Sequence, residues 1–327
     1  MHYSPFGSTG IRVSQIALGT GMLGTSRTGQ IDRSQAEDIV NTYLEAGGNL
    51  IDTSDAYLGG ESEEMLGQFL LGRRENVVLL TKYTRTTERT AAPARTGNHR
   101  KAMLQSIRAS LKRLRTDCVD FYFAHADDGV TPVEEIMRGF DDLVRQGKIL
   151  FGGLSNFSAW RTAQAATLAG AKNWAPLCGL EVEYSLLQRT TEREILPLAR
   201  DSGLGVLGYS PLATGMLTAK RTTLDPSQAS RTGYPTEANV PRTLANLEKV
   251  AAEQKSTPAN VALAWCMAKG VIPVIGVRDV VQLREILRAS ALELTNGQLE
   301  SLDSASAIPL GYPHSVLRTY SGLPKFD

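Results

Sequence analysis

Four polar side chains in the first half of the chain could together deliver a proton to a substrate oxygen. These side chains are Asp52, Tyr57, Lys82 and His125. A free phenol is too weak an acid to be poised near neutral pH, but an adjacent ammonium stabilises the phenolate and lowers its pKa. A carboxylate beyond the lysine keeps the ammonium charged, and an imidazole can hydrogen-bond a carbonyl oxygen. We therefore predict that Tyr57 donates the proton, that Lys82 tunes its pKa and that His125 orients a carbonyl group.

Such an acid completes the reduction of a carbonyl group only when a hydride also arrives, which implies a redox cofactor. More hydrogen-bonding residues end the later apolar runs of the sequence, namely Ser155, Asn156, Glu181, Tyr209, Ser210 and Arg278. Taken one at a time, a charged residue after a strand is usually solvated and a tyrosine is usually half-buried packing. Their repeated position after apolar runs favours one shared site.

Eight short apolar runs alternate with longer amphipathic segments along almost the whole chain. The runs lie at residues 15–19, 49–52, 77–81, 118–125, 149–155, 177–183, 204–210 and 271–277. Strand-sized runs that are apolar throughout predict a parallel sheet buried on both faces. Eight such units favour a closed (β/α)8 TIM barrel over an open doubly wound sheet. Because no Pro/Gly/Ser-rich linker interrupts the alternation, we expect one domain over residues 1–327 with the chemistry at the carboxyl ends of the strands.

Helical periodicity occurs in the segments between these runs. The clearest is residues 100–114, where apolar side chains recur about once per helical turn. The expected helices are residues 35–46 after Ser34 as N-cap, 100–114, 133–146, 159–168, 191–201, 257–268 and 280–289. Two stretches depart from the alternation of apolar runs and amphipathic segments. We expect residues 213–241 to form a long polar loop after the seventh strand and residues 308–327 to form an irregular tail.

One glycine motif could mislead. Residues 19–24 match the G-x-G-x-x-G dinucleotide fingerprint after a strand. That fingerprint requires a helix to begin at the glycines, so that the pyrophosphate meets the helix N-terminus. Here the polar residues 25–33 come first, which favours a loop over the first strand.

Other well-known catalytic motifs are missing from the sequence. It contains no G-x-S-x-G elbow, no Walker loop and no H-E-x-x-H. Its four histidines are not at metal-ligand spacing, so we expect no metal.

The composition is that of an ordinary globular protein. The chain has 327 residues, of which 42% are hydrophobic and 21% charged, with a net charge of +1. This balance predicts neither a nucleic acid nor a membrane as a partner. No signal peptide opens the sequence, and no apolar run reaches the roughly 18 residues of a membrane helix. Cys118, Cys178 and Cys266 have no C-x-x-C spacing, which predicts free thiols and a cytoplasmic location.

Four motifs at the predicted strand ends resemble those of the aldo-keto reductase superfamily. They are NLIDTSDAYLGGESEEMLGQFL, TDCVDFYFAH, GKILFGGLSNFS and GYSPLATGMLT. The resemblance extends from FGSTGIRVSQIALGT near the N-terminus to IPVIGVRDVVQLREIL, and so covers nearly the whole chain. Its subtype resembles bacterial and potassium-channel-β-like reductases more than the mammalian aldose reductase group.

The resemblance implies a catalytic tetrad of Asp52, Tyr57, Lys82 and His125. It implies that Ser155 and Asn156 bind the nicotinamide carboxamide and that Tyr209 stacks on the ring. Arg278 corresponds to the basic residue at the adenosine 2′-phosphate, so NADPH is the expected cofactor and NADH is possible. The implied cofactor-binding residues are Gly19, Thr20, Asp52, Ser155, Asn156, Glu181, Tyr209, Ser210, Pro211, Leu212, Gly215, Gly276, Arg278, Gln282 and Glu285.

Three residues depart from the family pattern. Glu181 stands where a glutamine commonly meets the carboxamide. Val277 stands where a serine or threonine often meets the 2′-phosphate, and Ile286 where an asparagine often contacts the adenine. The last two departures weaken the preference for NADPH over NADH.

The leading hypothesis is an NADPH-dependent oxidoreductase that reduces an aldehyde or ketone, with a small carbonyl compound as its substrate. A second hypothesis is a regulatory or binding subunit with weak catalysis, as in channel β proteins. A third is an aldolase in which Lys82 forms a Schiff base. Double-bond reduction in steroid-like substrates is a further variant, but that branch carries glutamate at the position of His125. Neither the natural substrate nor an oligomeric state follows from the sequence.

Overall fold

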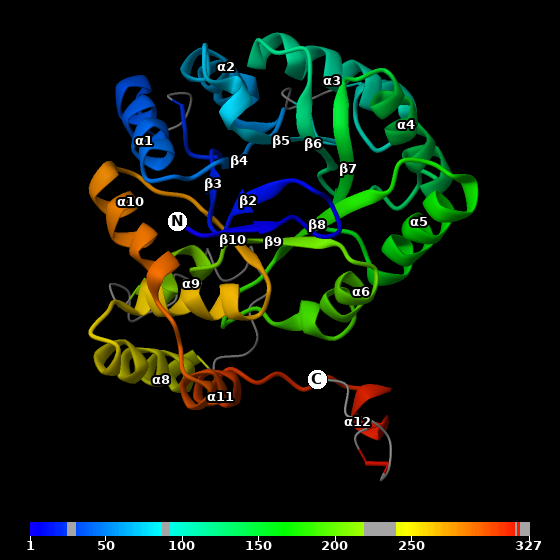
Figure 1. Ribbon diagram of the computed structural model, residues 1–327. Helices are drawn as coiled ribbons and strands as arrows, with labels where there is room; N and C mark the ends of the chain where they lie inside the picture. The colour runs from blue at the N-terminus through cyan, green and yellow to red at the C-terminus, as the bar shows by residue number, and fades with distance from the viewer. Residues whose placement is uncertain (25–30, 87–91, 219–239, 318, 321–327) are drawn as a thin grey trace.

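A computed structural model shows eight parallel strands closed into a barrel (Figure 1). The structure describes residues 1–24, 31–86, 92–218, 240–317 and 319–320. The barrel strands are β3 (Ala17–Gly19), β4 (Leu50–Asp52), β5 (Val78–Tyr83), β6 (Val119–Ala124), β7 (Ile149–Ser155), β8 (Leu177–Glu183), β9 (Gly205–Tyr209) and β10 (Ile272–Ile275). Each strand pairs with the next along the chain, and β10 pairs with β3 to close the ring. The predicted single-domain (β/α)8 barrel is confirmed.

Helices surround the barrel (Figure 1). They are α1 (Arg33–Glu45), α2 (Glu61–Phe69), α3 (Arg100–Leu114), α4 (Val133–Arg145), α5 (Ala159–Lys172), α6 (Ile195–Asp201), α8 (Val240–Glu253), α9 (Pro258–Ala268), α10 (Val280–Leu287), α11 (Asn296–Ala305) and α12 (His314–Leu317). None of the helices that the structure describes is both long and apolar enough to cross a membrane.

The expected helices are present, but several of their boundaries differ. Helix α1 begins at Arg33 because the Asp32 side chain, rather than Ser34, accepts the Gln35 amide as N-cap. The expected helix at residues 191–201 divides into a 3-10 turn (Thr190–Glu192) and α6.

Several further elements were not expected. They are the helices α2, α8, α11 and α12 and an N-terminal hairpin of β1 (Tyr3–Pro5) and β2 (Arg12–Ser14). Helix α12 lies within the expected irregular tail at 308–327, of which residues 318 and 321–327 lie outside the described residues. Of the expected loop at 213–241, residues 219–239 lie outside the described residues, Ala213–Thr218 form the kinked 3-10 helix η5, and α8 begins at Val240.

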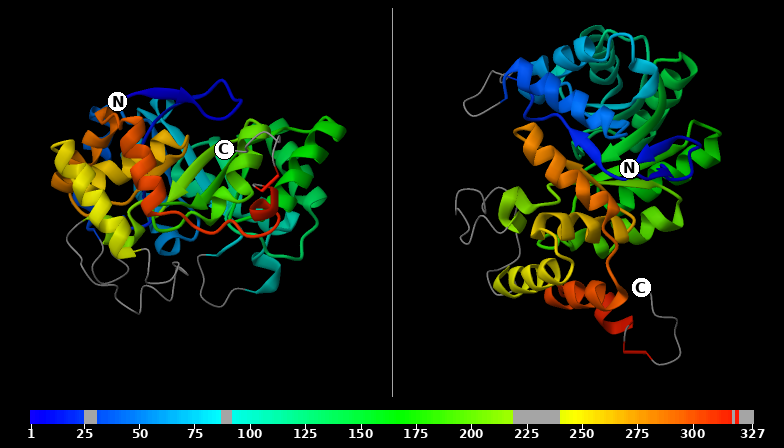
Figure 2. Two further views of the ribbon diagram at one scale, coloured as in Figure 1. Left: turned by 90° about the horizontal axis from the view of Figure 1, so that it is seen from below. Right: turned by 60° about the vertical axis from the view of Figure 1, so that its left-hand side comes forward.

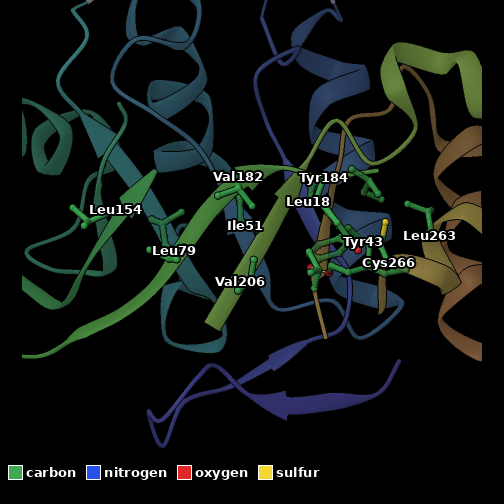
Figure 3. Close-up of a cluster of buried hydrophobic side chains, with 14 of the residues drawn as sticks. Leu18, Tyr43, Ile51, Leu79, Leu154, Val182, Tyr184, Val206, Leu263 and Cys266 are labelled. Carbon is green, nitrogen blue, oxygen red and sulfur yellow. Dashed lines mark hydrogen bonds between the residues drawn. The ribbon is translucent and has the colours of Figure 1, made fainter. Parts of the chain in front are cut away.

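The barrel strands are apolar throughout because both of their faces are buried. One set of side chains fills the interior of the barrel: Ala17, Leu50, Leu80, Phe121, Phe123 and Leu207. The other set packs against the surrounding helices and includes Leu18, Ile51, Leu79, Val182 and Val206 (Figure 3). The one-residue alternation between the two sets is the side-chain period of a β-strand.

The N-terminal hairpin lies across one end of the barrel (Figure 2). Its loop inserts Phe6, which is fully buried and packs with its ring centroid 4.8 Å from that of Phe121. A Cβ atom added to Gly179 or Gly205 would lie 2.5–2.6 Å from the Phe6 ring, so only glycine fits at these two positions. The amino end of the barrel is therefore filled, and the functional side chains lie at the carboxyl end.

Candidate active site

The four candidate catalytic residues come from three adjacent strands. Asp52 is the last residue of β4, Lys82 is the next-to-last residue of β5, and His125 directly follows β6. Tyr57 begins the short 3-10 helix η1 (Tyr57–Gly60) after β4. Because parallel strands end on the same rim, these separate segments of the sequence bring the four side chains together.

The ammonium of Lys82 is the centre of the cluster. Its Nζ donates to the carboxylate of Asp52 and to the Thr53 carbonyl, at 3.2 Å in the second case. The same Nζ lies 3.4 Å from the Tyr57 hydroxyl and 3.1 Å from Oε2 of Glu181. The side chains of Lys82, Asp52 and Glu181 are only 0%, 2% and 3% exposed, respectively, so this charge cluster is shielded from water.

Lys82 remains a cation despite its burial. Burial lowers the pKa of the amine, but the carboxylates of Asp52 and Glu181 outweigh it and raise the pKa above its usual value. A Schiff base requires a neutral amine as nucleophile. The surroundings of Lys82 therefore argue against an aldolase.

The pKa of Tyr57 differs from the sequence expectation. Burial is the largest effect and raises the pKa above its ordinary value, and the carboxylates of Asp52 and Glu181 add to it. The ammonium of Lys82 lowers the pKa, as expected, but only in part. The expectation of a net decrease was wrong because the sequence does not show how deeply the phenol is buried. Tyr57 keeps its proton at neutral pH, as a proton donor must.

His125 is a neutral imidazole beside the phenol. Burial, assisted by Lys82 and Arg85, lowers its pKa to about 2. The ring lies edge-on to Tyr57, with centroids 5.8 Å apart and an interplanar angle of 83°. Its Nδ1 is 3.1 Å from the hydroxyl of Ser54, which leaves Nε2 as the other hydrogen-bonding atom.

Ser54 and Asp55 are buried polar residues that the sequence analysis missed. The Ser54 hydroxyl that contacts His125 also lies 3.3 Å from Oδ1 of Asp55. The other carboxyl oxygen of Asp55 accepts from Ser106 at 2.6 Å, and burial raises the pKa of Asp55 to about 7. A signal was available: residues 52–55 form a run of short polar side chains directly after an apolar strand, a pattern typical of a buried polar network.

The rim beyond His125 holds the predicted nicotinamide-binding residues. Asn156 Nδ2 donates to the carbonyl of His125 and to the Ser155 hydroxyl, both at 3.0 Å. The Tyr209 hydroxyl donates to Asn156 Oδ1 at 2.9 Å. Asn156 and Ser210 have φ angles of 55° and 52°, a conformation that non-glycine residues rarely adopt. Backbone strain of this kind often marks a functional site.

Glu181 lies between these two groups of residues. In the barrel it is in register with Ser155 of β7 and Leu207 of β9. Its Oε2 lies 3.1 Å from Lys82 Nζ but accepts no hydrogen bond. The position predicted from the sequence to meet the carboxamide thus also belongs to the charge cluster around Lys82.

The predicted phosphate-binding residues lie after β9 and β10. Ser210, Pro211 and Leu212 follow β9 directly, and Gly215 has a φ angle of 94° within η5. Gly276 and Arg278 follow β10 and are exposed, and Gln282 and Glu285 lie on α10.

The N-terminus of α10 is held by two side chains. Asp279 is its N-cap and accepts the Gln282 amide at 2.7 Å, and Gln282 Oε1 accepts the Arg278 amide at 2.9 Å. The carboxylate of Asp279 is therefore engaged in the helix cap. The departures Val277 and Ile286 are buried in the core, which accounts for their apolar side chains.

Gly19 and Thr20 support the site from β3. A Cβ atom at Gly19 would lie 2.9 Å from Val274, so this position requires glycine for packing. Thr20 is fully buried, and its hydroxyl donates to the carbonyl of Asp52 at 2.9 Å. No helix begins at the described residues of the glycine motif at 19–24, and the next described helix begins at Arg33, so the motif lacks the geometry of a Rossmann fingerprint.

No group of three or more potential metal ligands occurs among the residues with described positions. The chemistry of the cluster at the carboxyl rim is instead that of proton transfer, since it consists of a phenol, an ammonium, an imidazole and carboxylates. Together with the barrel, this defines a (β/α)8-barrel protein with a candidate proton-transfer site at its carboxyl rim.

Comparison with known proteins agrees with this class. Residues 15–307 match the family model described as the aldo/keto reductase family, and the chain belongs to that family. The uncharacterized oxidoreductase YrpG of Bacillus subtilis is 37% identical over 328 residues, which cover 95% of this chain and 98% of the relative. Norsolorinic acid reductase of Aspergillus flavus is 33% identical over 322 residues, covering 95% and 82% of the two chains. An aryl-alcohol dehydrogenase of Pestalotiopsis microspora is 31% identical over 322 residues, covering 95% and 83%.

Proposed function

We propose that this aldo/keto reductase interconverts an aldehyde or ketone and the corresponding alcohol, with NADPH as the preferred cofactor and NADH as an alternative. The observation that carries the proposal is the protonated Tyr57 hydroxyl 3.4 Å from the Lys82 ammonium, beside a neutral His125. We also propose a place in the bacterial, potassium-channel-β-like branch of the family, and the similarity to YrpG of Bacillus subtilis supports the bacterial part of this proposal.

The proton chemistry belongs to Tyr57. Its hydroxyl donates a proton to the substrate oxygen as negative charge develops there, while Lys82 stabilises the resulting phenolate. Asp52 holds the ammonium in place. Nε2 of His125 can hydrogen-bond the same substrate oxygen, because its other ring nitrogen is occupied by Ser54. The nicotinamide cofactor supplies the hydride in reduction.

The residues of the rim fit such a cofactor. Ser155 and Asn156 offer a hydroxyl and an amide for the carboxamide, and the ring of Tyr209 is held beside them through Asn156. The N-terminus of α10 with Arg278 suits a phosphate, because the helix dipole and an exposed guanidinium both favour an anion. We infer that this end of the site holds the adenosine 2′-phosphate.

The name of one relative points to aromatic substrates. This relative is an aryl-alcohol dehydrogenase. We therefore propose that aromatic aldehydes and ketones belong in the first substrate panel. We also propose that residues 1–327 act as one domain in the cytoplasm, where the free thiols of Cys118, Cys178 and Cys266 would stay reduced.

The test is NADPH consumption with a panel of aliphatic, aromatic and sugar carbonyl compounds, repeated with Tyr57→Phe. We expect turnover of at least one compound, and a loss of about 100-fold or more in kcat for the variant, the usual scale of a general acid. NADPH should still bind to the variant. The matched control is Tyr3→Phe, which removes an exposed hydroxyl far from the rim. Turnover by Tyr57→Phe at the wild-type rate would contradict the proposal.

A further inference from the structure

The side chain of Lys82 faces two buried carboxyl groups. Asp52 forms a direct ion pair with it, and Glu181 lies 3.1 Å from the same nitrogen. Two carboxylates and one ammonium would leave a net charge of −1 in a region shielded from water. Burying an uncompensated charge is costly, and such sites commonly take up a proton instead.

The two carboxyl groups meet at the same nitrogen. Both lie against Lys82 Nζ in a region shielded from water, and two carboxyl groups can share a hydrogen bond only when one of them is protonated. Burial, followed by the neighbouring carboxyl of Asp52, raises the pKa of Glu181 to about 8, while Lys82 opposes this shift. Burial also raises the pKa of Asp52. The pair titrates as a unit, so its proton belongs to both groups.

We propose that Glu181 and Asp52 share one proton at neutral pH, and that losing it to solvent as the pH rises adds a negative charge to the cofactor site. This inference rests on the proposed function for its consequence, but not for the shared proton itself. An oxidised nicotinamide ring carries a positive charge and a reduced ring carries none. The added charge therefore favours the oxidised cofactor, and Glu181 becomes a residue that selects the redox state that binds.

The other titratable groups near Glu181 keep their charge over this pH range. On the far side of the ammonium, Tyr57 has a raised pKa, as does Lys82 itself, and His125 has a lowered one. The residues paired with Glu181 on the neighbouring strands, Ser155 of β7 and Leu207 of β9, carry no charge. Asp55, with a pKa of about 7, titrates in an overlapping range, so it has to be removed from the experiment.

The test starts from the Asp55→Asn protein and compares it with Asp55→Asn/Glu181→Gln. Infrared difference spectra are recorded without cofactor between about pH 6 and about pH 9.5, a window that spans the expected titration. We expect the first protein to lose the band of a protonated carboxylic acid as the pH rises. The second protein should lack that band, because Asp52 then faces Lys82 as a simple ion pair.

The matched control is Glu63→Gln in the same background. Glu63 is also a buried glutamate, but it pairs with a single cation, Arg113, at 2.7 Å and accepts from Thr81. Its substitution should leave the titrating band in place. The proposal is overturned if the Asp55→Asn protein shows no protonated carboxyl band near pH 6, or if Glu181→Gln leaves the band unchanged.

The consequence for the cofactor is measured by fluorescence titration of NADPH and NADP⁺ with the same proteins. In the Asp55→Asn protein, which keeps Glu181, the ratio of the Kd of NADPH to that of NADP⁺ should rise about tenfold between about pH 6 and about pH 9. A change of about tenfold is the order of the effect of one buried charge on binding. With Glu181→Gln the ratio should change by less than about twofold. A pH-independent ratio in both proteins overturns the proposed role in redox selection. Binding of neither cofactor would refute the proposed function, and the infrared spectra would still decide whether the proton is shared.

Discussion

At the scale of single residues, Asp55 connects the stability of the barrel to its chemistry. Its carboxyl group is buried behind His125, and its described partners are the hydroxyls of Ser54 and Ser106. Neither hydroxyl carries a charge that could compensate a carboxylate. Burial therefore raises the pKa of Asp55 to about 7, with Ser106 acting in the opposite direction.

This shift predicts a pH-dependent contribution to stability. Between about pH 4 and pH 7 the folded state holds a proton on Asp55 that the unfolded state has lost, so the free energy of unfolding falls as the pH rises. The contribution is complete below about pH 4, the ordinary value for an aspartate, and it is lost above about pH 7. A rise of the Asp55 pKa from about 4 to about 7 corresponds to at most about 4 kcal/mol in the free energy of unfolding.

Asp55→Asn should remove that loss, because the amide stays neutral at every pH. The free energy of unfolding of the variant, relative to that of the wild type, should therefore be higher at about pH 8 than at about pH 5. Urea denaturation at the two pH values measures it. The same substitution at the exposed Asp201 serves as a control and should change the two stabilities equally. A wild type and an Asp55→Asn protein with parallel pH–stability curves would show that Asp55 is ionised throughout.

At the scale of secondary-structure elements, we expect the N-terminus of α10 to determine the choice of cofactor. Asp279 and Gln282 fix the turn that presents Arg278, and the helix dipole adds to the positive charge there. We expect Arg278→Ala to lower kcat/KM for NADPH by about tenfold or more, the scale of a lost charge-assisted hydrogen bond. The value for NADH should change by less than about twofold, since NADH lacks the phosphate.

The matched control for this experiment is Arg284→Ala, which removes an exposed arginine from the last turn of the same helix. It should leave both cofactors unaffected. A wild type that prefers NADH, or an Arg278→Ala protein that loses efficiency equally with both cofactors, would rule out the phosphate role of Arg278.

The strands were predictable from the sequence, whereas several helices were not. A strand buried on both faces is apolar at every position, which makes it recognisable without knowledge of its neighbours. Helix α2 (Glu61–Phe69) has three glutamates in its first turn, and one of them, Glu63, is buried because Arg113 of α3 pairs with it. The sequence does not show that contact, so the segment did not resemble an amphipathic helix. The strands of the N-terminal hairpin, at three residues each, are too short to give a period.

The same distinction applies to the site. The rim positions of Asp52, Lys82 and His125 follow from where strands end, which the apolar runs locate. The pKa of Tyr57 depends on burial, and the contact of Ser54 with His125 depends on a loop that folds back. These are properties of the packed molecule, and neither the residue types nor their spacing encode them.

At the scale of the whole molecule, Phe6 joins the N-terminal hairpin to the opposite side of the barrel. It packs on Phe121 and fills the space left by Gly179 and Gly205. We expect Phe6→Ala to lower the free energy of unfolding by about 3–5 kcal/mol, the usual cost of such a cavity. Urea denaturation would measure it, with Tyr3→Phe as the control in the same hairpin.

The kinetics of the folded Phe6→Ala protein should remain those of the wild type, because the hairpin lies at the end of the barrel opposite the rim. A loss of stability below about 1 kcal/mol would mean that the surrounding side chains collapse into the cavity. A large change in KM would mean instead that the filled end of the barrel controls the shape of the rim.

The position of the hairpin has a consequence for how the chain is made. Residues near Phe6 are translated before the barrel strands, but Ser8 docks against Gly203, and the edge of β3 that faces β10 has no partner until Ile272–Ile275 has been synthesised. An unpaired strand edge and an exposed phenylalanine promote association with other chains. The hairpin and β3 therefore wait for segments that are translated much later, and a nascent chain stalled before residue 272 would be the form of this protein that most needs a chaperone.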